Sequence, residues 1–184
     1  GYFGTILTST NGFSWTQRDS GTSRILSGIT NGKGLFVTVG SGGIILTSTN
    51  GIKWTSNLDD SRTSQDIWGV TYGNDKFVSV GSGGTTLTSF DGKFWTGTNS
   101  GTSKRLNGVT FGNGLFVTVG SEGVILTSTN GTFWTRKGSW TSHYLYGVTY
   151  KNEIFMTVGW DMTLTSQYGK SWTDNFLGKE TTLY

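Results

Sequence analysis

The sequence predicts an all-β fold, a β-propeller of four-stranded antiparallel blades with four complete blades and one split blade, or five blade equivalents. Two observations lead to this prediction. The 184-residue chain repeats itself with a period of about 40 residues, the range in which tandem repeats build propellers and solenoids. Each period also contains four short segments rich in β-branched and aromatic residues, and turn-forming residues bound every segment.

Three sequence anchors mark the repeat and keep the same order in every period. The first is the tryptophan that closes a Leu-Thr-Ser-x-Asn-Gly-x-x-Trp-Thr segment, called a box turn below, at spacings of 39, 41, 39 and 38 residues. The second is the glycine of Leu-x-Gly-Val-Thr-Tyr segments, called the anchor glycine, and the third is the final glycine of Phe-Val-x-Val-Gly. The three sets are Trp15, Trp54, Trp95, Trp134 and Trp172; Gly28, Gly69, Gly108 and Gly147; and Gly40, Gly81, Gly120 and Gly159.

One period shows how the strands are expected to run. Within residues 25–57 the strands are predicted at 25–30, 35–39, 44–48 and 52–56. The last connection is Asn50-Gly51, which favours a two-residue hairpin turn because Asn and Gly tolerate positive φ. No stretch combines helical periodicity with capping residues over about ten positions, so no helix is expected. Each period therefore reads as a four-stranded antiparallel meander.

A unit of this size cannot bury both faces of its own sheet, so neighbouring units must stack. Radial stacking gives a propeller, whereas an open solenoid is the alternative. We expect residues 1–184 to form a single domain, with a split blade whose end part is 1–18 and whose start is 181–184. The complete blades are predicted at 25–57, 66–98, 105–137 and 144–175.

The split blade leaves three possibilities for the ring. Gly1 aligns with Gly40, and residues 181–184 align with the start of a first strand, so about 12 further residues would complete the fifth blade. A missing segment could close the ring, the termini could pair with another chain through an open strand edge, or the ring could be larger and belong to a longer parent protein.

Composition narrows the class of protein. With 33% apolar and 14% aromatic residues the chain can build one layered core. Its net charge of +3 is spread along the sequence without a basic stripe, so nucleic acid is not expected as a partner. The absence of cysteine excludes disulfides, thiolate metal sites and thiol catalysis, and leaves the redox compartment undetermined.

The sequence also bears on the protein's location. No apolar run approaches the roughly 20 residues needed to span a bilayer, so no membrane span is expected. Sparse charge with abundant Thr, Ser, Asn and Gly is typical of bacterial secreted or surface proteins. We therefore expect an extracellular or cell-surface location, with any export signal outside this sequence.

At the box turns, residues 9–15, 48–54, 89–95, 128–134 and 166–172, the chain resembles the Asp-box, or bacterial neuraminidase repeat, family of β-propellers. Sialidases and photosystem II assembly factors have such propellers. The boxes here are one residue shorter than the common form, and only Asp91 supplies the acid that names them. The resemblance implies a structural role, in which the Asn or Asp side chain bonds backbone N–H groups and the tryptophan packs beneath. The residues with this role are Asn11, Trp15, Asn50, Trp54, Asp91, Trp95, Asn130, Trp134 and Trp172.

The resemblance also raises the question of catalysis. Sialidase chemistry implies an arginine triad, a tyrosine paired with glutamate, and an aspartic acid. None of the arginines or glutamates lies in a motif that matches these roles: Arg18, Arg24, Arg62, Arg105 and Arg136; Glu122, Glu153 and Glu180. The single histidine lacks a nucleophile motif, and Asp59-Asp60 lacks calcium-loop spacing. The sequence therefore predicts no enzyme activity, no cofactor and no metal.

Strand alternation predicts which face of the propeller is free to bind. In a four-stranded meander the second turn and the blade-to-blade connection emerge on one face, and the first and third turns on the other. All five arginines are expected in the connections. The repeat is irregular on that face, because of drift or because of function, and the residue before the anchor glycine is Ser27, Trp68, Asn107 or Tyr146. The candidate ligand-binding residues are Arg24, Trp68, Glu122, His143, Tyr146, Trp160 and Asp161, with Trp140 as a further aromatic platform.

Three functions remain open at this point. The first is a non-catalytic recognition module that binds a protein or glycan through aromatic and polar side chains on this face. The second is a structural or assembly scaffold that forms homo-oligomers through the incomplete blade. The third is a fragment of a sialidase-like glycoside hydrolase.

Overall fold

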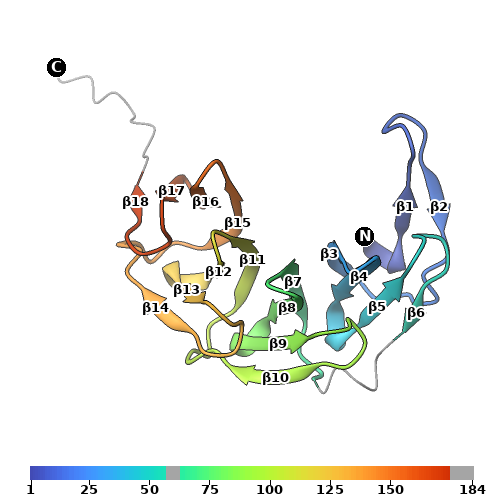
Figure 1. Ribbon diagram of the computed structural model, residues 1–184, viewed down its shortest axis with the longest axis horizontal. Coiled ribbons are helices and arrows are strands. Elements are labelled where there is room, and N and C mark those ends of the chain that lie inside the picture. Colours follow the sequence, from blue (N-terminus) through green and yellow to red (C-terminus); the bar gives the residue numbers. More distant parts are fainter. Residues whose placement is uncertain (57–62, 175–184) are drawn as a thin grey trace.

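The computed structural model describes residues 1–56 and 63–174 as five small antiparallel sheets that follow one another along an arc (Figure 1). Four of the sheets have four strands and the first has two. The predicted strand at 181–184 lies outside the described residues. This radial succession of small sheets is the architecture of β-propeller blades, which confirms the predicted fold class.

Each sheet takes its strands from one stretch of sequence. The two-stranded sheet contains β1 (Ile6–Thr8) and β2 (Thr16–Arg18). The first full blade contains β3 (Leu26–Gly32), β4 (Leu35–Gly40), β5 (Ile45–Ser48) and β6 (Thr55–Ser56). The second contains β7 (Ile67–Gly73), β8 (Lys76–Gly81), β9 (Thr85–Ser89) and β10 (Thr96–Asn99). The third contains β11 (Leu106–Gly112), β12 (Leu115–Gly120), β13 (Ile125–Ser128) and β14 (Thr135–Lys137). The fourth contains β15 (Leu145–Lys151), β16 (Ile154–Gly159), β17 (Met162–Ser166) and β18 (Thr173–Asp174).

Within each full blade the strands pair in sequence order, so every blade is an antiparallel meander. The only helical segments among residues 1–56 and 63–174 are single 3₁₀ turns, at Tyr2–Gly4, Ser41–Gly43, Ser82–Gly84 and Ser121–Gly123. Three of these form the second turn of a blade. They tighten the turn within three residues, too few to show the periodicity by which a helix is recognised in sequence.

The box turn differs from the hairpin expected at Asn50-Gly51. Gly51 has a φ of 72°, whereas Asn50 is not among the residues with positive φ. A two-residue type I′ turn needs both residues in the left-handed region, so that prediction was wrong. The loop instead runs from Thr49 to Trp54, and the outer strand is reduced to Thr55–Ser56. Hydrogen bonds from the side chains of the box, described below, hold this longer loop.

Because the fourth strand of each blade starts later than predicted, two of the arginines lie in strands and not in connections. Because each box turn delays the fourth strand, Arg18 lies in β2 and Arg136 lies in β14. Only Arg24 and Arg105 lie in blade-to-blade connections among the described arginines, and Arg62 lies outside the described residues. The expectation that all five arginines lie in connections was therefore wrong.

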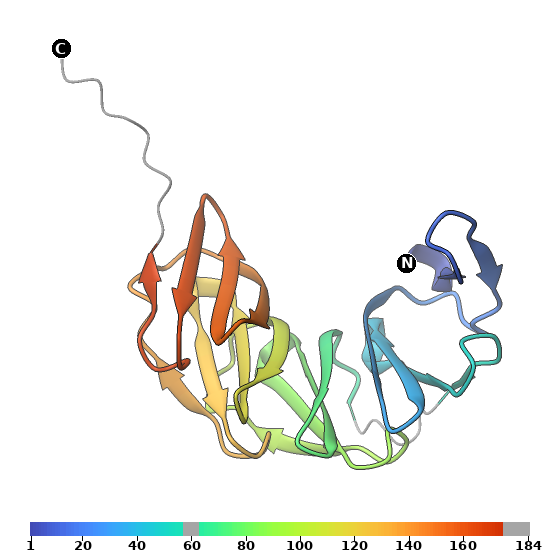
Figure 2. The ribbon, with the colours of Figure 1, turned by 45° about the horizontal axis from the view of Figure 1, so that its top comes forward.

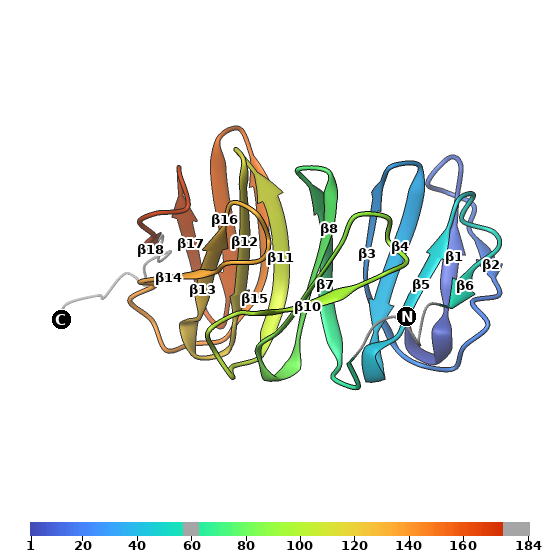
Figure 3. The ribbon, with the colours of Figure 1, turned by 60° about the horizontal axis from the view of Figure 1, so that its bottom comes forward.

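The inner strands β3, β7, β11 and β15 stand side by side along the inside of the arc (Figures 1 and 3). At the anchor glycines these strands approach closely. A Cβ atom built on Gly69 would lie 3.3 Å from the Cα of Gly108, and one on Gly108 would lie 3.2 Å from the Cα of Gly147. Such contacts are tight for a side chain, so the fold needs glycine here because neighbouring backbones meet.

The core lies between the blades. Val37 and Val39 of β4 pack in one cluster with Val70, Phe77 and Trp95 of the next blade, and all five are buried. The corresponding residues of the following blades form two further clusters. Because each blade covers the apolar face of its neighbour, burial at about 25 cal/mol per Å² favours the arc over separate sheets. The two ends of the arc stand apart (Figure 2).

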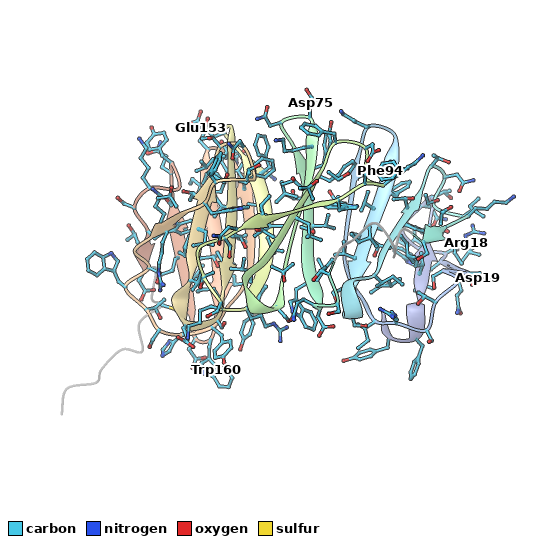
Figure 4. The ribbon with its side chains drawn as sticks, turned by 90° about the horizontal axis from the view of Figure 1, so that it is seen from below. Arg18, Asp19, Asp75, Phe94, Glu153 and Trp160 are labelled. Carbon is cyan, nitrogen blue, oxygen red and sulfur yellow. The ribbon has the colours of Figure 1, made fainter. Side chains whose placement is uncertain are left out.

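The turns divide between two faces as the alternation predicted. Asp75 and Glu153 in first turns and Phe94 in a box turn lie toward one face, whereas Trp160 in a second turn projects from the other (Figure 4). We call these the box-turn face and the second-turn face. Within residues 1–56 and 63–174 there is no helix with the length and hydropathy needed to cross a membrane.

Candidate binding surface on the second-turn face

The second-turn face is formed by the second turns and the blade-to-blade connections. Its framework is a repeated backbone contact, in which the first N–H group of each second turn donates to the carbonyl of the residue three places before the anchor glycine. The four bonds are Ser41 to Ile25 at 2.9 Å, Ser82 to Asp66 at 2.8 Å, Ser121 to Arg105 at 2.9 Å and Trp160 to Tyr144 at 3.0 Å. We call Ile25, Asp66, Arg105 and Tyr144 the variable row. The fold uses only their carbonyl groups in this contact, which leaves their side chains free to differ.

Two side chains of the variable row reach the preceding blade. The Oδ1 atom of Asp66 accepts a hydrogen bond of 2.8 Å from the backbone N–H of Gly42. The guanidinium carbon of Arg105 lies 3.8 Å from the ring centroid of Trp68, which is a cation–π contact. The indole N–H of Trp68 donates to the hydroxyl of Ser82 at 2.9 Å, so the ring is held from its edge as well as its face.

An ion pair joins the third full blade's connection to its second turn. Nζ of Lys104 is 2.6 Å from a carboxylate oxygen of Glu122, and the two side chains are 42% and 55% exposed. Because both charges face solvent, the pair contributes little to folding stability. Lys104 directly precedes Arg105 in the sequence, and Arg105 is exposed.

The predicted site residues fall into two groups on this face. In the first three full blades, Arg24, Trp68 and Glu122 make contacts within the protein. Arg24 donates to the backbone carbonyl of Gly42 at 2.7 Å, and so supports a second turn.

The other group lies on the fourth blade and is open to solvent. Tyr146 is 50% exposed and Trp160 is 63% exposed, while His143 and Asp161 are also exposed. Trp140, in the connection that precedes them, is 95% exposed. The structure thus separates the predicted residues into Arg24, Trp68 and Glu122, each held by contacts within the protein, and an exposed aromatic and polar group on the last blade.

The sequence-based prediction missed Arg105 as a partner of Trp68, and Asp66 as a contact to the preceding blade. A signal for both was present, because the variable row changes from Ile to Asp to Arg to Tyr while the neighbouring apolar position stays Ile or Leu. The sequence does not show whether such a side chain contacts the preceding blade or its own blade.

On the opposite face, four box turns share one hydrogen-bond network. In the second of them the Oδ1 atom of Asn50 accepts from the N–H groups of Ile52 and Lys53 at 2.9 and 3.1 Å, and the hydroxyl of Ser48 accepts from Gly51 at 2.9 Å. Equivalent bonds surround Asn11, Asp91 and Asn130. These side chains are engaged by their own loop backbone.

Asp91 is the one charged member of this set. Partial desolvation alone would raise the pKa of its carboxyl group. Hydrogen bonds from the N–H groups of Phe94 and Lys93 and from the hydroxyl of Ser89 outweigh that effect, so the pKa of Asp91 is lower than usual.

The fifth box turn lacks this network. Tyr168 replaces the Asn or Asp, and the hydroxyl of Ser166 is buried without a hydrogen-bond partner, as is the indole N–H of Trp172.

The box tryptophans are not equally packed. Trp95 and Trp172 are 3% and 4% exposed, and each lies within 6.5 Å, centroid to centroid, of a phenylalanine on the second strand of its own blade. Trp15 donates its indole N–H to the Gly12 carbonyl at 3.2 Å, as Trp54 and Trp95 do in their turns, but its side chain is 59% exposed. In the part of the chain that the structure describes, its sheet has two strands and no counterpart of β8 or β16 to supply a phenylalanine.

Across residues 1–56 and 63–174 there is no group of three or more His, Asp or Glu side chains that could hold a metal ion. The Arg105–Trp68 stack presents hydrogen-bond donors beside an aromatic ring.

No family model matches the chain, and no curated protein matches it. Its fold is shared by solved structures. The chain is 18% identical to YCF48 from Cyanidioschyzon merolae, with a TM-score of 0.62 over 82% of this chain and 56% of that one. For YCF48 bound to D1 peptide the identity is 16% and the TM-score 0.71, over 94% and 60%. For a chain of a nidogen/laminin complex the values are 14% and 0.66, over 88% and 66%.

The class that the fold and these similarities define is therefore the β-propeller. At such low identities the similarity shows the fold alone. The chain spans between 56% and 66% of the length of these three relatives.

Proposed function

We propose that the protein is a non-catalytic recognition module that binds a peptide or protein segment on its second-turn face, centred on Trp68 and Arg105. The observation that carries this proposal is the stack of the Arg105 guanidinium on the Trp68 ring. Tryptophan and arginine are enriched among the residues that contribute most to protein–protein binding.

The stack prepares both side chains for a ligand. Arginine presents donors in a planar fork, and stacking on an aromatic ring fixes the orientation of that plane. The bond from Trp68 to Ser82 restricts the indole in turn. Because these side chains are already ordered, they would lose less conformational entropy when a partner binds than flexible arginine and tryptophan side chains would.

The composition of this surface favours a protein partner over nucleic acid. Lys104, the cation that precedes Arg105 in sequence, is paired with Glu122, so the charge on this blade is mixed and does not form a strip of phosphate-binding cations. Among proteins of the same fold, one solved structure holds YCF48 bound to D1 peptide and another is a nidogen/laminin complex. These relatives support the proposal by showing that the fold occurs in peptide and protein complexes.

The test is selection from a random peptide library displayed on phage, with the whole chain as bait. We expect the enriched peptides to lose affinity about tenfold or more for Arg105→Ala and for Trp68→Ala, a loss of roughly 1.4 kcal/mol. Lys93→Ala is the matched control, because Lys93 is an exposed cation on the box-turn face. It should bind the same peptides as the unmodified protein.

Folding is checked by thermal unfolding, in which Arg105→Ala should change the free energy by about 1 kcal/mol at most. Peptides that bind Arg105→Ala as tightly as the parent would contradict the proposal. A glycan array is the second test, and it distinguishes a peptide ligand from a glycan ligand. Glycan binding that disappears in Trp68→Ala, with no peptide enriched, would identify a lectin instead.

A further inference from the structure

An apolar groove lies at the other end of the described chain, between the sheet β1–β2 and the first full blade. It encloses about 530 Å³, and its walls include Leu7, Trp15, Ile29, Phe36 and Trp54. The sheet β1–β2 and the fourth full blade lie at opposite ends of the arc (Figure 1). None of the residues that line the groove belongs to the candidate groups on the second-turn face.

At the other junctions between blades, the apolar residues that correspond to the walls of this groove are covered by the preceding blade. Phe36 is 37% exposed, whereas its counterparts Phe77 and Phe116 are 0% exposed. Ile29 is 59% exposed, whereas its counterpart Val70 is 8% exposed. The first full blade therefore carries the same apolar face as the others, but nothing in the described chain covers its inner half.

The other junctions show what covers that face. A Cβ atom built on Gly92, in the second full blade, would lie 2.8 Å from a methyl of Leu35 and 3.1 Å from one of Val37, both on β4 of the preceding blade. The corresponding Gly51 has only Thr8 at 3.5 Å and Phe36 of its own blade at 3.9 Å. The missing neighbour is thus a second strand with the pattern of β4.

Strand β1 offers an edge to such a strand. Its counterpart β5 pairs with β4 on one side and β6 on the other, whereas β1 pairs with β2 alone in the part of the chain that the structure describes. The N–H and C=O groups along the other side of β1 form an open template for strand addition.

The outer half of the position is already occupied. Ile6 of β1 packs with Leu26, Ile44 and Leu46 in a buried cluster. A complete four-stranded blade of a second copy would therefore collide with β1 and β2. The space that remains beside β1 can hold two strands but not four, so the occupant that fits it is a β-hairpin.

We propose that this groove binds a two-stranded β-hairpin with the sequence pattern of the repeat's own inner pair, Leu-x-Gly-Val-Thr followed by Phe-Val-x-Val, because Gly1 already fills the position of the closing glycine. The second strand of the hairpin pairs with β1, and its two valines cover Ile29 and Phe36. In the third full blade Val117 pairs with Thr127 and Val119 with Ile125. By the same register, a hairpin of that sequence places its valines opposite Thr8 and Ile6.

The probe is a labelled synthetic peptide with the sequence of residues 105–119, titrated into the whole chain and followed by fluorescence anisotropy. We expect saturable binding with one peptide per chain. Hydrogen exchange should slow at the backbone N–H groups of Ile6–Thr8, because they enter a new strand pair. A peptide in which Val117 and Val119 are both replaced by aspartate should bind at least about tenfold more weakly.

Two variants of the protein locate the site. Ile29→Asp changes a side chain that is 59% exposed and should lower peptide affinity about tenfold or more without unfolding the chain. Val158→Asp is the matched control, since Val158 is 50% exposed on β16 at the opposite end of the arc. It should bind the peptide unchanged, and thermal unfolding verifies that both variants are folded.

The proposal is overturned if the peptide does not bind, if Val158→Asp and not Ile29→Asp removes binding, or if exchange at Ile6–Thr8 is unaffected. A dimer in sedimentation experiments that becomes a monomer in Ile29→Asp would also overturn the proposal, because a second copy would then occupy the groove. The result is independent of phage selection on Arg105, because the two surfaces share no residue.

Discussion

The box-turn face and the second-turn face use side chains in opposite ways. In four box turns the Asn or Asp side chain and the neighbouring serine hydroxyl bond the loop's own backbone, so their identity recurs. In the variable row the backbone carbonyl makes the repeated bond, and the side chain changes from Ile25 to Asp66, Arg105 and Tyr144. Residue identity is thus retained where the fold uses the side chain, and varies where the fold uses the backbone alone.

The largest expected effect tests the packing of the box turns. Trp95→Ala removes a side chain that is 3% exposed, and should lower the free energy of unfolding by about 3–5 kcal/mol through lost burial and an unfilled cavity. Trp15→Ala removes the equivalent side chain at 59% exposure and should cost about 0.5 kcal/mol. Urea unfolding of both variants measures the difference. Equal losses would show that the two turns do not differ in packing.

An intermediate effect tests the hydrogen bonds of the box. Ser128→Ala removes the hydroxyl that accepts from Gly131 at 2.8 Å and should cost about 1–2 kcal/mol, because a buried N–H loses its partner. Ser166→Ala, in the turn where Tyr168 replaces Asn, removes a hydroxyl that is already unpaired and should be neutral or slightly stabilising.

Both serine variants can be measured by thermal unfolding under one set of conditions. Tyr168→Asn sharpens the result, because it supplies an acceptor for Ser166 and should raise the stability of the fourth blade by about 1 kcal/mol. If Ser166→Ala cost as much as Ser128→Ala, the unpaired hydroxyl would not be a feature of the protein in solution.

The smallest expected effect concerns pH. The pKa of Asp91 is lowered in the folded protein from its ordinary value of 3.8, so its ionised form contributes stability above that value. This contribution should be lost as the pH falls through the lowered pKa. Asp91→Asn keeps the acceptor oxygen but does not titrate.

The measurement compares urea unfolding of the parent and of Asp91→Asn at about pH 6 and about pH 2.5, on either side of the aspartate titration. The parent should lose more stability than the variant on acidification. A difference between the two proteins that stays the same at both pH values would count against a lowered pKa at this turn.

Much of the architecture was visible in the sequence because its causes are local or repeat exactly in phase. Box turns are specified within seven residues, and the anchor glycines recur because neighbouring backbones meet there. The two-residue turn at Asn50-Gly51 was mispredicted because the serine and asparagine side chains of the box stabilise a longer loop. That error also misplaced Arg18 and Arg136.

The site was less accessible to sequence reasoning. Trp68 and Glu122 were chosen as irregularities of the repeat, but the partners that define their environment, Arg105 and Lys104, depend on contacts across or within blades. Phe36 looks like Phe77 in sequence, and only the absence of a covering strand makes one half-exposed and the other buried.

By itself the sequence determined the period, the strand order, the two faces and the turn chemistry, because these follow from hydrogen bonds and alternation within about 40 residues. The tertiary structure alone decided the Arg105–Trp68 stack, the exposure of Trp15 and the apolar groove at Ile29. These features depend on what the adjoining blade presents, and that neighbour lies tens of residues away in the chain or is not in the described chain at all.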